Sequence, residues 1–388
     1  MTKPADAKNA PPTISFGPRV HKSPYFDATL RYGAKSFTIY NHVYMPTCYS
    51  SPVEEYWSLV NDVTLWDVSC QRQIEITGPD AFRFIQFLTP RDMSHCEVGQ
   101  CKYMMLTNQD GGIVNDAILL RVREDQFWLS PGDGDVLMWA SGAAVNSGMD
   151  VRVFEPDVSP LQLQGPKSPH VARDLFGDWV LDMKYYWLKE TTLDGIPLVI
   201  SRTGWSGELG YELYLQDSTC GDVLWERVMD AGKLYNIKPT APNTIRSIEG
   251  GLLSYVSDIT LQDNPFVIGM DKFVNLDQDD DFIGKVALTK IKAEGVKRRL
   301  IGIEITGAPL TGSNEHFWAV SKNGEQIGHV TRCVYSPRLK KNIGWANVAS
   351  EYSSIGTKFY VAASDGDRHA TVCEAPWVKA EIRIPPLD

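Results

Sequence analysis

The chain has 388 residues, of which 38 are basic and 48 acidic, so its formal net charge is −10 at pH 7. This charge disfavours nucleic acid and anionic membrane surfaces as partners. No apolar segment approaches the roughly 20 residues that cross a bilayer, and a hydrophobic content of 43% is typical of a soluble globular protein. The length predicts two or three domains.

Residues 1–19 form a polar segment, and Met1–Pro12 lacks the apolar core of a signal peptide. We expect a disordered leader on a cytoplasmic protein. The seven cysteines are scattered and include no C-x-x-C pair. We therefore expect reduced thiols that are mostly buried.

Hydrophobic periodicity and turn residues predict an alternation of helices and strands through the first three quarters of the chain. In chain order, the expected elements are a helix at 53–61, a strand at 73–77, a helix at 80–88, a hairpin of strands 101–106 and 118–122 closed by 108–112, a strand at 127–130, a helix at 133–147, a strand at 158–164 and helices at 169–176, 222–235, 241–253 (capped near Asn243) and 283–296. Residues 297–388 are rich in strand patterns with Gly and Pro turns, which predicts a separate all-β domain.

The most informative segment is Ser201–Leu215. Glycines at 204, 207 and 210 predict a loop that a flat ligand can approach closely, and the alternating residues after it predict a strand. On that strand, Glu212 and Tyr214 share one face. A carboxylate so placed can accept two parallel hydrogen bonds from an N–H/NH2 edge, such as that of a pterin or a guanidinium. The alternative is a solvated glutamate on an edge strand.

Other polar groupings are less specific. The Gly111–Asp116 turn places Asn115 and Asp116 at the entrance of a strand, where ordinary turn chemistry is the alternative explanation. Asp277, Asp279 and Asp281 do not complete a calcium loop, because Phe282 stands where that loop requires Gly. The histidines show no paired ligand spacing, so we expect no metal site.

Eight segments, in order, resemble those of the folate-dependent aminomethyltransferase (glycine-cleavage T-protein) superfamily, over nearly the whole chain from about residue 20. They are Leu65–Ser69, Gly78–Ala81, Gly111–Asp116, Leu163–Lys167, Arg202–Glu212, Arg246–Gly251, Phe282–Lys285, and Gly328–Thr331 with Ser336-Pro337. Four others resemble the dimethylsulfoniopropionate demethylase branch of that superfamily, namely Trp66–Gln73, Arg91–Ser94, Glu155–Leu161 and Gly251–Tyr255.

The resemblance implies an α+β fold with three domains around a central folate channel. Residues 20–150 and 151–296 would form two interleaved α+β domains that bind folate, and residues 297–388 a C-terminal β-barrel-like domain. It further implies tetrahydrofolate as the methyl acceptor, no metal, a small-molecule methyl donor, and a monomer or homodimer.

Site roles follow from the resemblance and from the aromatic residues near the matched segments. Glu212 is expected to bind the pterin amino edge, and Arg246 the acidic tail of the folate. The full expected set is Asn115, Asp116 and Tyr214 as catalytic residues, Glu212, Tyr103, Trp205 and Arg246 as folate-binding residues, and Tyr44, Trp66, Trp187 and Tyr214 as donor-binding residues.

The function that the resemblance implies is transfer of a methyl group from a small onium compound, such as dimethylsulfoniopropionate, to N5 of tetrahydrofolate. Glycine-cleavage enzymes usually carry two acids where this chain has Asn115 and Asp116, which favours plain methyl transfer. The Ser206–Gly210 loop departs from the Lys-Gln-Gly form of the demethylase branch, so the donor pocket is expected to differ. Three alternatives remain open: O- or N-demethylation of a methoxy-aromatic or a betaine, glycine-cleavage aminomethyl transfer, and folate binding without turnover.

Overall fold

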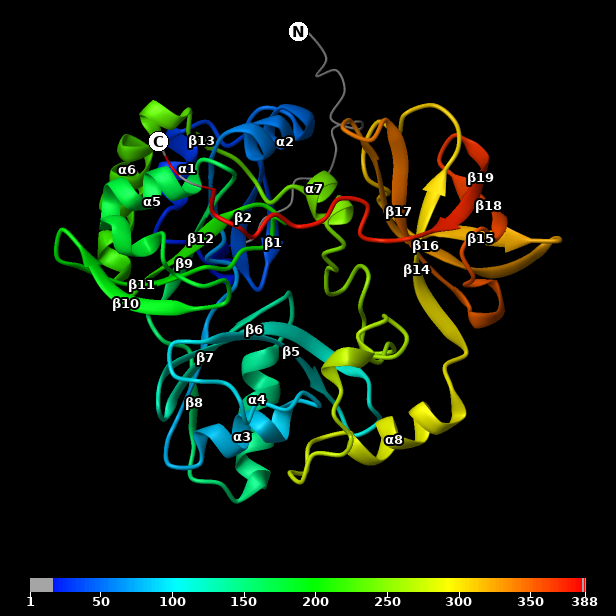
Figure 1. Ribbon diagram of the computed structural model, residues 1–388, viewed down its shortest axis with the longest axis horizontal. Helices are drawn as coiled ribbons and strands as arrows, with labels where there is room; N and C mark the ends of the chain where they lie inside the picture. Colours follow the sequence, from blue (N-terminus) through cyan, green and yellow to red (C-terminus); the bar gives the residue numbers. More distant parts are fainter. Residues whose placement is uncertain (1–16, 386, 388) are drawn as a thin grey trace, which may run out of the picture.

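A six-stranded sheet organises the first lobe of the molecule. The computed structural model describes residues 17–385 and 387, so the predicted leader lies almost wholly outside the described residues. The strand order is β10-β11-β12-β9-β3-β13, with bounds Leu188–Leu193, Ile196–Ser201, Gly210–Leu215, Ser159–Gln164, Thr64–Asp67 and Lys238–Pro239. One face packs against helices at the upper left of Figure 1, which are α1 (Phe26–Arg31), α5 (Ser168–Phe176) and α6 (Gly221–Gly232).

A five-stranded sheet forms the second lobe. Its order is β5-β6-β7-β4-β8, with bounds Cys101–Thr107, Ile113–Arg123, Gln126–Pro131, Ile74–Thr77 and Arg152–Phe154. Helices α3 (Ala81–Leu88) and α4 (Val136–Ser147) cover one face through a core that includes Phe84 and Leu119. The chain therefore passes from the first sheet to the second after β3 and returns after β8.

The two sheets meet through a shared apolar cluster. Its buried members are Cys101, Leu120, Val122, Trp128, Val158, Leu188, Val199 and Tyr214. At this junction the backbone of Tyr186 donates to Arg202 O (3.0 Å) and accepts from Cys101 N (2.8 Å). The relative position of the two sheets is thus fixed by hydrogen bonds as well as by packing.

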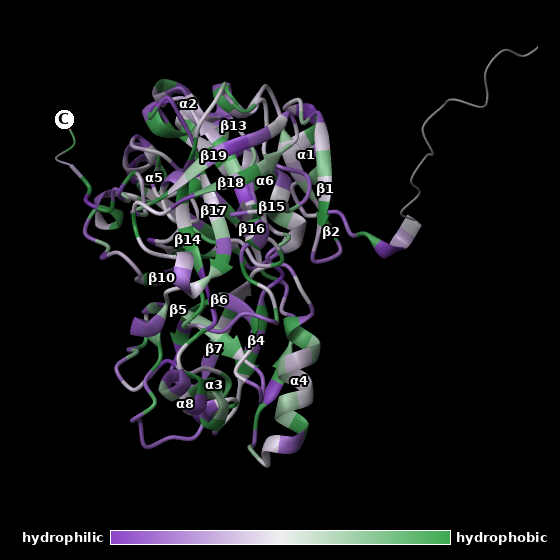
Figure 2. Cartoon of the chain, turned by 90° about the vertical axis from the view of Figure 1, so that its right-hand side faces the viewer, coloured by the Kyte–Doolittle hydropathy of each residue, from purple (hydrophilic) through white to green (hydrophobic). Residues whose placement is uncertain are grey.

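The C-terminal part is a closed antiparallel barrel of order β14-β17-β16-β15-β18-β19, and this confirms the predicted α+β class with a terminal β-barrel. The bounds are Arg298–Ile305, Lys341–Ala349, Glu325–Ser336, Trp318–Lys322, Lys358–Ala363 and Gly366–Cys373. Figure 2 shows hydrophobic and hydrophilic residues mixed along the helices and strands. After the barrel, the chain crosses back to the first lobe, where Glu381 N donates to Gly207 O (3.1 Å) (Figure 1).

Several predicted boundaries differ from the structure for local reasons. The helix expected at 241–253 is α7, Thr244–Glu249, because Gly251 adopts φ 73° and turns the chain out of the helix. Its predicted cap is confirmed, since Asn243 Oδ1 accepts from Arg246 N at 3.1 Å. The helix expected at 283–296 is α8, Lys285–Glu294, which ends before Gly295 at φ 76°. Helix α2 spans Pro52–Asn61.

Two hairpins were absent from the sequence prediction: β1–β2 (Ser36–Tyr40 and Val43–Cys48) and β10–β11. The tip of the first hairpin is Asn41-His42, with both residues at positive φ. No helix in the described part of the chain is both long and apolar enough to cross a membrane.

Candidate functional site

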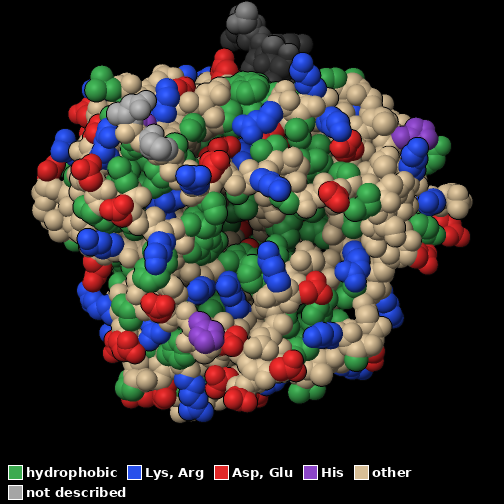
Figure 3. All heavy atoms as spheres, in the orientation of Figure 1, with side chains coloured by type: hydrophobic (Ala, Val, Ile, Leu, Met, Phe, Trp, Pro, Cys, Tyr) green, Lys and Arg blue, Asp and Glu red, His purple; other side chains and the backbone are tan. Residues whose placement is uncertain are grey.

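A cavity of about 820 Å³ lies where the two sheets, the barrel and the loop at residues 251–257 meet. Its size falls within the range of small-molecule sites, about 300–1,000 Å³. Figure 3 shows a hollow near the centre of one face, with hydrophobic side chains around it. Strands of the first sheet contribute Trp66, Gln162 and Glu212 to the lining, and β5 and β6 of the second sheet contribute Tyr103 and Asp116.

Glu212 lies on the predicted strand and lines one wall of the cavity. The strand register aligns Trp66 with Gln162 and Gln162 with Glu212 across β3, β9 and β12. Glu212 is 3% exposed, accepts from Gln162 Nε2 at 2.9 Å, and also accepts from Thr203 Oγ1. Burial raises the pKa of this carboxyl, and the hydrogen bonds oppose that shift. Because each oxygen receives one protein donor, each keeps a lone pair for a ligand.

The glycines of the loop before β12 serve a purpose that differs from the one predicted. A Cβ at Gly204 would lie 2.2 Å from Gln164 Oε1, and a Cβ at Gly210 would lie 2.3 Å from Gln164 Nε2. These two glycines therefore make room for the buried Gln164 side chain beneath the loop. Only Gly204 also lines the cavity among the three glycines of this loop.

Asp116 lies on the opposite wall, on β6 and not in a turn. Burial raises its pKa to about 6, and the hydrogen bond that Tyr103 Oη donates to Asp116 Oδ2 (3.1 Å) opposes the shift. The Tyr103 ring packs against Phe273 with centroids 5.3 Å apart. A carboxyl with this pKa is an anion at neutral pH that can still accept a proton.

Asn115 does not line the cavity. It is fully buried, its Oδ1 accepts from Gly132 N (2.8 Å), and its Nδ2 donates to Asp133 O (2.9 Å). Asn115 therefore holds the backbone of the loop after β7, and the structure does not bring this predicted catalytic residue to the cavity surface. The sequence pattern placed Asn115 and Asp116 in a turn, whereas successive strand residues point to opposite faces.

Tyr214 and Arg246 also lie behind the wall. Tyr214 is fully buried between the sheets, with its ring 6.1 Å from that of Trp128. Burial raises its pKa well above the usual value, and the nearby Glu212 raises it further. Arg246 is 1% exposed, pairs with Glu208 at 2.6 Å and donates to Gly207 O at 2.7 Å. Neither side chain lines the cavity, so the structure places Tyr214 and Arg246 behind its wall and not at its surface.

The predicted aromatic residues divide between cavity and core. Trp66 lines the cavity, although its Nε1 is buried without a partner, and Trp205 lines it with its Nε1 donating to Leu253 O (3.3 Å). Tyr44 packs against Phe26, with ring centroids 5.3 Å apart, and Trp187 packs beside Gly99. Neither Tyr44 nor Trp187 lines the cavity, so the structure does not bring these two predicted donor-binding residues to it.

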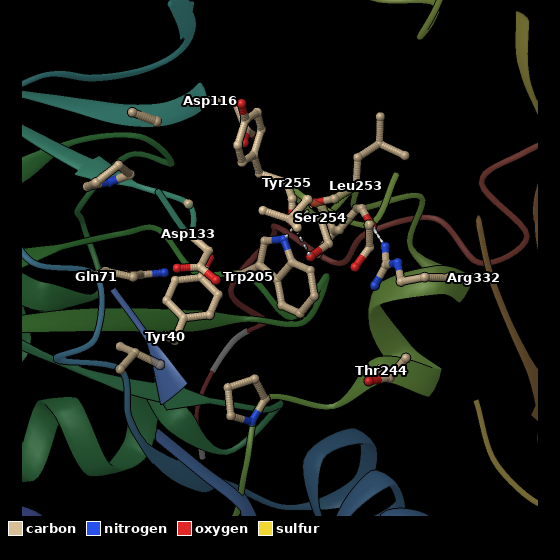
Figure 4. Close-up of a pocket in the computed structure, with 18 of the residues that line it drawn as sticks. Tyr40, Gln71, Asp116, Asp133, Trp205, Thr244, Leu253, Ser254, Tyr255 and Arg332 are labelled. Carbon is tan, nitrogen blue, oxygen red and sulfur yellow. Dashed lines mark hydrogen bonds between the residues drawn. The ribbon is translucent and has the colours of Figure 1, made fainter. Parts of the chain in front are cut away.

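Sequence reasoning missed several lining residues, of which Figure 4 shows Tyr40, Gln71, Asp133, Tyr255 and Arg332. They come from the β1–β2 hairpin, the loops after β3 and β7, the loop after α7, and the barrel. Gln71 and Tyr255 lie in segments that the family resemblance had matched, but only the fold brings these five residues together. In the described residues, no group of three or more His, Cys, Asp or Glu side chains could hold a metal ion.

Comparison with known proteins identifies the family. Residues 25–278 match the GCVT N-terminal domain, and residues 298–379 match the glycine cleavage T-protein C-terminal barrel domain. The chain is 35% identical, over 92% of its length and 98% of the relative's, to dimethylsulfoniopropionate demethylase DmdA of Ruegeria pomeroyi. It is 31% identical, over 93% and 98%, to an aminomethyltransferase of Thermoanaerobacter pseudethanolicus.

The same architecture occurs in the crystal structure of the glycine cleavage system aminomethyltransferase T from Bartonella henselae, with a TM-score of 0.84, 23% identity, and coverage of 93% of this chain and 99% of that one. That likeness extends to the fold alone. The two domain matches and the two similar sequences show that the chain belongs to the glycine cleavage T-protein family of tetrahydrofolate-dependent one-carbon transferases.

Proposed function

We propose that this protein transfers a methyl group from a small onium donor, such as dimethylsulfoniopropionate, to N5 of tetrahydrofolate. The observation that carries the proposal is a cavity of about 820 Å³. On one wall lies Glu212, whose carboxylate can accept hydrogen bonds from a pterin, and other carboxylates and aromatic rings line the rest. The similarity to the Ruegeria demethylase over 92% of the chain supports a sulfonium donor.

The lining residues fit the folate. Glu212 can accept the amino edge of a pterin, while Trp205 and Tyr103 offer aromatic surface beside it. Tetrahydrofolate supplies the nucleophilic nitrogen in this chemistry. Arg246 is excluded as the partner of the folate tail by its burial, and Lys272, which is exposed at the cavity lining, is the better candidate for that carboxylate.

The protein need not provide a nucleophile of its own. Cys70 lines the cavity, but burial raises the pKa of its thiol well above the usual value, so it stays protonated and unreactive. In direct transfer a bond forms between N5 and the methyl carbon as the carbon–sulfur bond breaks, the electron pair of the broken bond stays on sulfur, and N5 loses one proton. Asp116, with a pKa of about 6, is placed to accept that proton at its carboxylate. Holding donor and acceptor in line can supply about 7–11 kcal/mol of the barrier reduction.

The test is a donor panel incubated with tetrahydrofolate, with the folate product identified by mass. The panel contains a sulfonium, a betaine, a methoxy-aromatic compound and an aminomethyl-lipoyl protein. We expect 5-methyltetrahydrofolate from the sulfonium and no metal requirement in the presence of a chelator. Methylene-tetrahydrofolate from the lipoyl protein would instead identify glycine cleavage, and folate binding without any product would reject an enzymatic role for these donors.

A further inference from the structure

One corner of the cavity carries negative charge that no basic side chain neutralises. Asp133, on the loop after β7, and Asp116 both line this corner. Asp133 Oδ1 accepts from Asn41 N at 2.8 Å, and Asp116 Oδ2 accepts from Tyr103. In the part of the chain that is described, neither carboxylate forms an ion pair, and the cavity-lining Arg332 is already paired with the buried Asp258.

The carboxylates of Asp116 and Asp133 lie near the same two aromatic residues, Tyr40 and Tyr255. A Cβ at Gly132, next to Asp133, would lie 3.4 Å from Asp116 Oδ1 and 3.1 Å from Tyr255 Cβ. Burial raises the pKa of Tyr40 well above the usual value, and the charges of Asp116 and Asp133 both add to the shift, as they do only at short range. In Figure 4, Asp133 and the Tyr40 ring lie together beside Gln71.

We propose that Asp133 is a specificity-determining residue that holds the cationic head of the methyl donor beside the rings of Tyr40 and Tyr255. This inference rests on the proposed function and adds the group that selects the donor. A cation among aromatic faces and one carboxylate is favourably bound, whereas an uncharged head of the same shape loses both interactions.

Asp133 suits this role better than the other acids of the cavity. Both oxygens of Glu212 receive protein hydrogen bonds. Asp116 Oδ2 accepts from Tyr103, and its carboxylate is the proposed acceptor of the proton that the transfer releases. Asp133 has one oxygen, Oδ2, to which no described protein group donates. Its position is also fixed from outside the cavity, because Asn41 Nδ2 donates to Gly132 O (3.0 Å) and Gly134 N donates to Asn41 Oδ1 (2.7 Å).

The charge of Asp133 should affect binding more than chemistry. Positive charge leaves the donor's head as the methyl group departs, so a fixed carboxylate stabilises the bound donor at least as much as the transition state. Removing the charge in Asp133→Asn is therefore expected to raise the KM for a sulfonium tenfold or more while kcat stays within about twofold. Asparagine keeps an oxygen for Asn41 N, so the loop is retained.

The test uses two probes of matched shape, dimethylsulfoniopropionate and 4-methylpentanoate, in which a CH group replaces the sulfonium. Their dissociation constants are measured by calorimetry. We expect the wild type to prefer the sulfonium at least tenfold and Asp133→Asn to bind the two within threefold. The matched control is Asp135→Asn, which makes the same charge change two residues away on a side chain that is 80% exposed, and it should keep the wild-type preference.

The outcomes separate this inference from the proposed function. An unchanged preference in Asp133→Asn would overturn the role of Asp133, even if the wild type methylates folate. If Asp133→Asn loses the preference that the wild type shows, but the wild type makes no methylated folate, the result would support the subsite and reject the reaction. Should Asp133→Asn unfold, Tyr40→Leu is the second variant, and equal weakening of both probes by Tyr40→Leu would count against the cation site.

Discussion

Individual side chains in this cavity are held by neighbours that are themselves buried. Glu212 is positioned by Gln162 and Thr203, and Asp133 by the backbone of Asn41. This preorganisation means that the acceptors need not rearrange when a ligand binds, so their contribution to affinity is not reduced by ordering. It also allows isosteric substitutions to remove one charge at a time.

Glu212→Gln tests the pterin contact. The change keeps the size of the side chain and removes the negative charge, so we expect folate binding to weaken by about 1.5–3 kcal/mol, as for loss of a charge-assisted hydrogen bond. Calorimetry with a reduced folate measures the effect. Glu226→Gln, on α6 and far from the cavity lining, is the control, and equal affinities for wild type and Glu212→Gln would remove Glu212 from the site.

Asp116 gives a pH-dependent prediction with a definite sign. Its pKa is about 6 in the folded protein against a usual value of 3.8, because burial disfavours the anion. The folded state therefore binds more protons between these two values, and stability falls as pH rises through that window. Two pKa units correspond to about 3 kcal/mol, so Asp116→Asn should be more stable than wild type at pH 7.5 by an amount of that order.

Thermal unfolding across pH checks the Asp116 prediction. The advantage of Asp116→Asn should disappear below about pH 4, where the carboxyl is protonated in both states. Wild-type kcat/KM should rise with pH through about 6 if the anion is the active form, and this rise should be absent in the variant. A variant that is less stable than wild type at pH 7.5 would contradict the burial argument.

At the level of elements, the loop from Leu252 to Asp258 joins all three lobes. Tyr255 Oη donates to Ile113 O (3.2 Å), Trp205 donates to Leu253 O, and Arg332 Nη2 donates to Leu252 O (2.8 Å). Within this loop Val256 has φ 71°, a left-handed conformation that β-branched residues rarely adopt. The contacts on either side keep the residue in this unfavourable geometry at the cavity wall.

Val256→Asn should relieve that strain. The left-handed region costs an ordinary residue about 1–2 kcal/mol and is more accessible to Asn, and Val256 is 57% exposed, so little burial is lost. We expect the melting temperature to rise in calorimetry. Val286→Asn, at an 86% exposed position within the helix α8, is the control and should not raise it; no gain in Val256→Asn would mean that the loop is not strained.

The sequence predicted elements well where a local pattern decides the structure. The strand carrying Glu212 and the cap at Asn243 depend on alternation and on one side chain, and both lie where they were expected. The pattern did not predict that Asn115 turns away from the cavity, because that depends on the backbone of Gly132 and Asp133, distant in the chain. The cavity positions of Tyr40 and Asp133 were missed for the same reason: Tyr40 ends strand β1 and Asp133 lies in an ordinary loop, and both reach the cavity only through tertiary contacts.

On the scale of the whole molecule, a buried ion pair joins the barrel to the loop at the cavity. Arg332 on β16 pairs with Asp258, which is 1% exposed, and Thr331 Oγ1 donates to the same carboxylate at 2.7 Å. The barrel and the cavity loop are therefore joined by a largely buried pair of opposite charges. Such a pair is sensitive to loss of one partner, because the other remains buried and uncompensated.

Arg332→Met should destabilise the protein by about 3–5 kcal/mol, since it leaves Asp258 unpaired. Denaturant unfolding measures the loss in the free energy of unfolding. Following it separately by a spectroscopic probe in the barrel and by folate binding shows whether the barrel unfolds independently of the other lobes. Arg299→Met, at an exposed position of β14, is the control and should change stability by less than about 0.5 kcal/mol. Equal stabilities of Arg332→Met and Arg299→Met would show that the ion pair does not join the lobes.

The β1–β2 hairpin offers a way to separate recognition of the methyl donor from binding of the folate. Its tip residue Asn41 bonds to Cys70, Gly132, Asp133 and Gly134 but to nothing near Glu212. Asn41→Gly tolerates the positive φ and keeps the N–H that Asp133 accepts, but it lacks the amide that bonds Gly132 and Gly134. The loop that carries Asp133 would thus be held less firmly, and the variant should bind tetrahydrofolate normally while discriminating less between methyl donors.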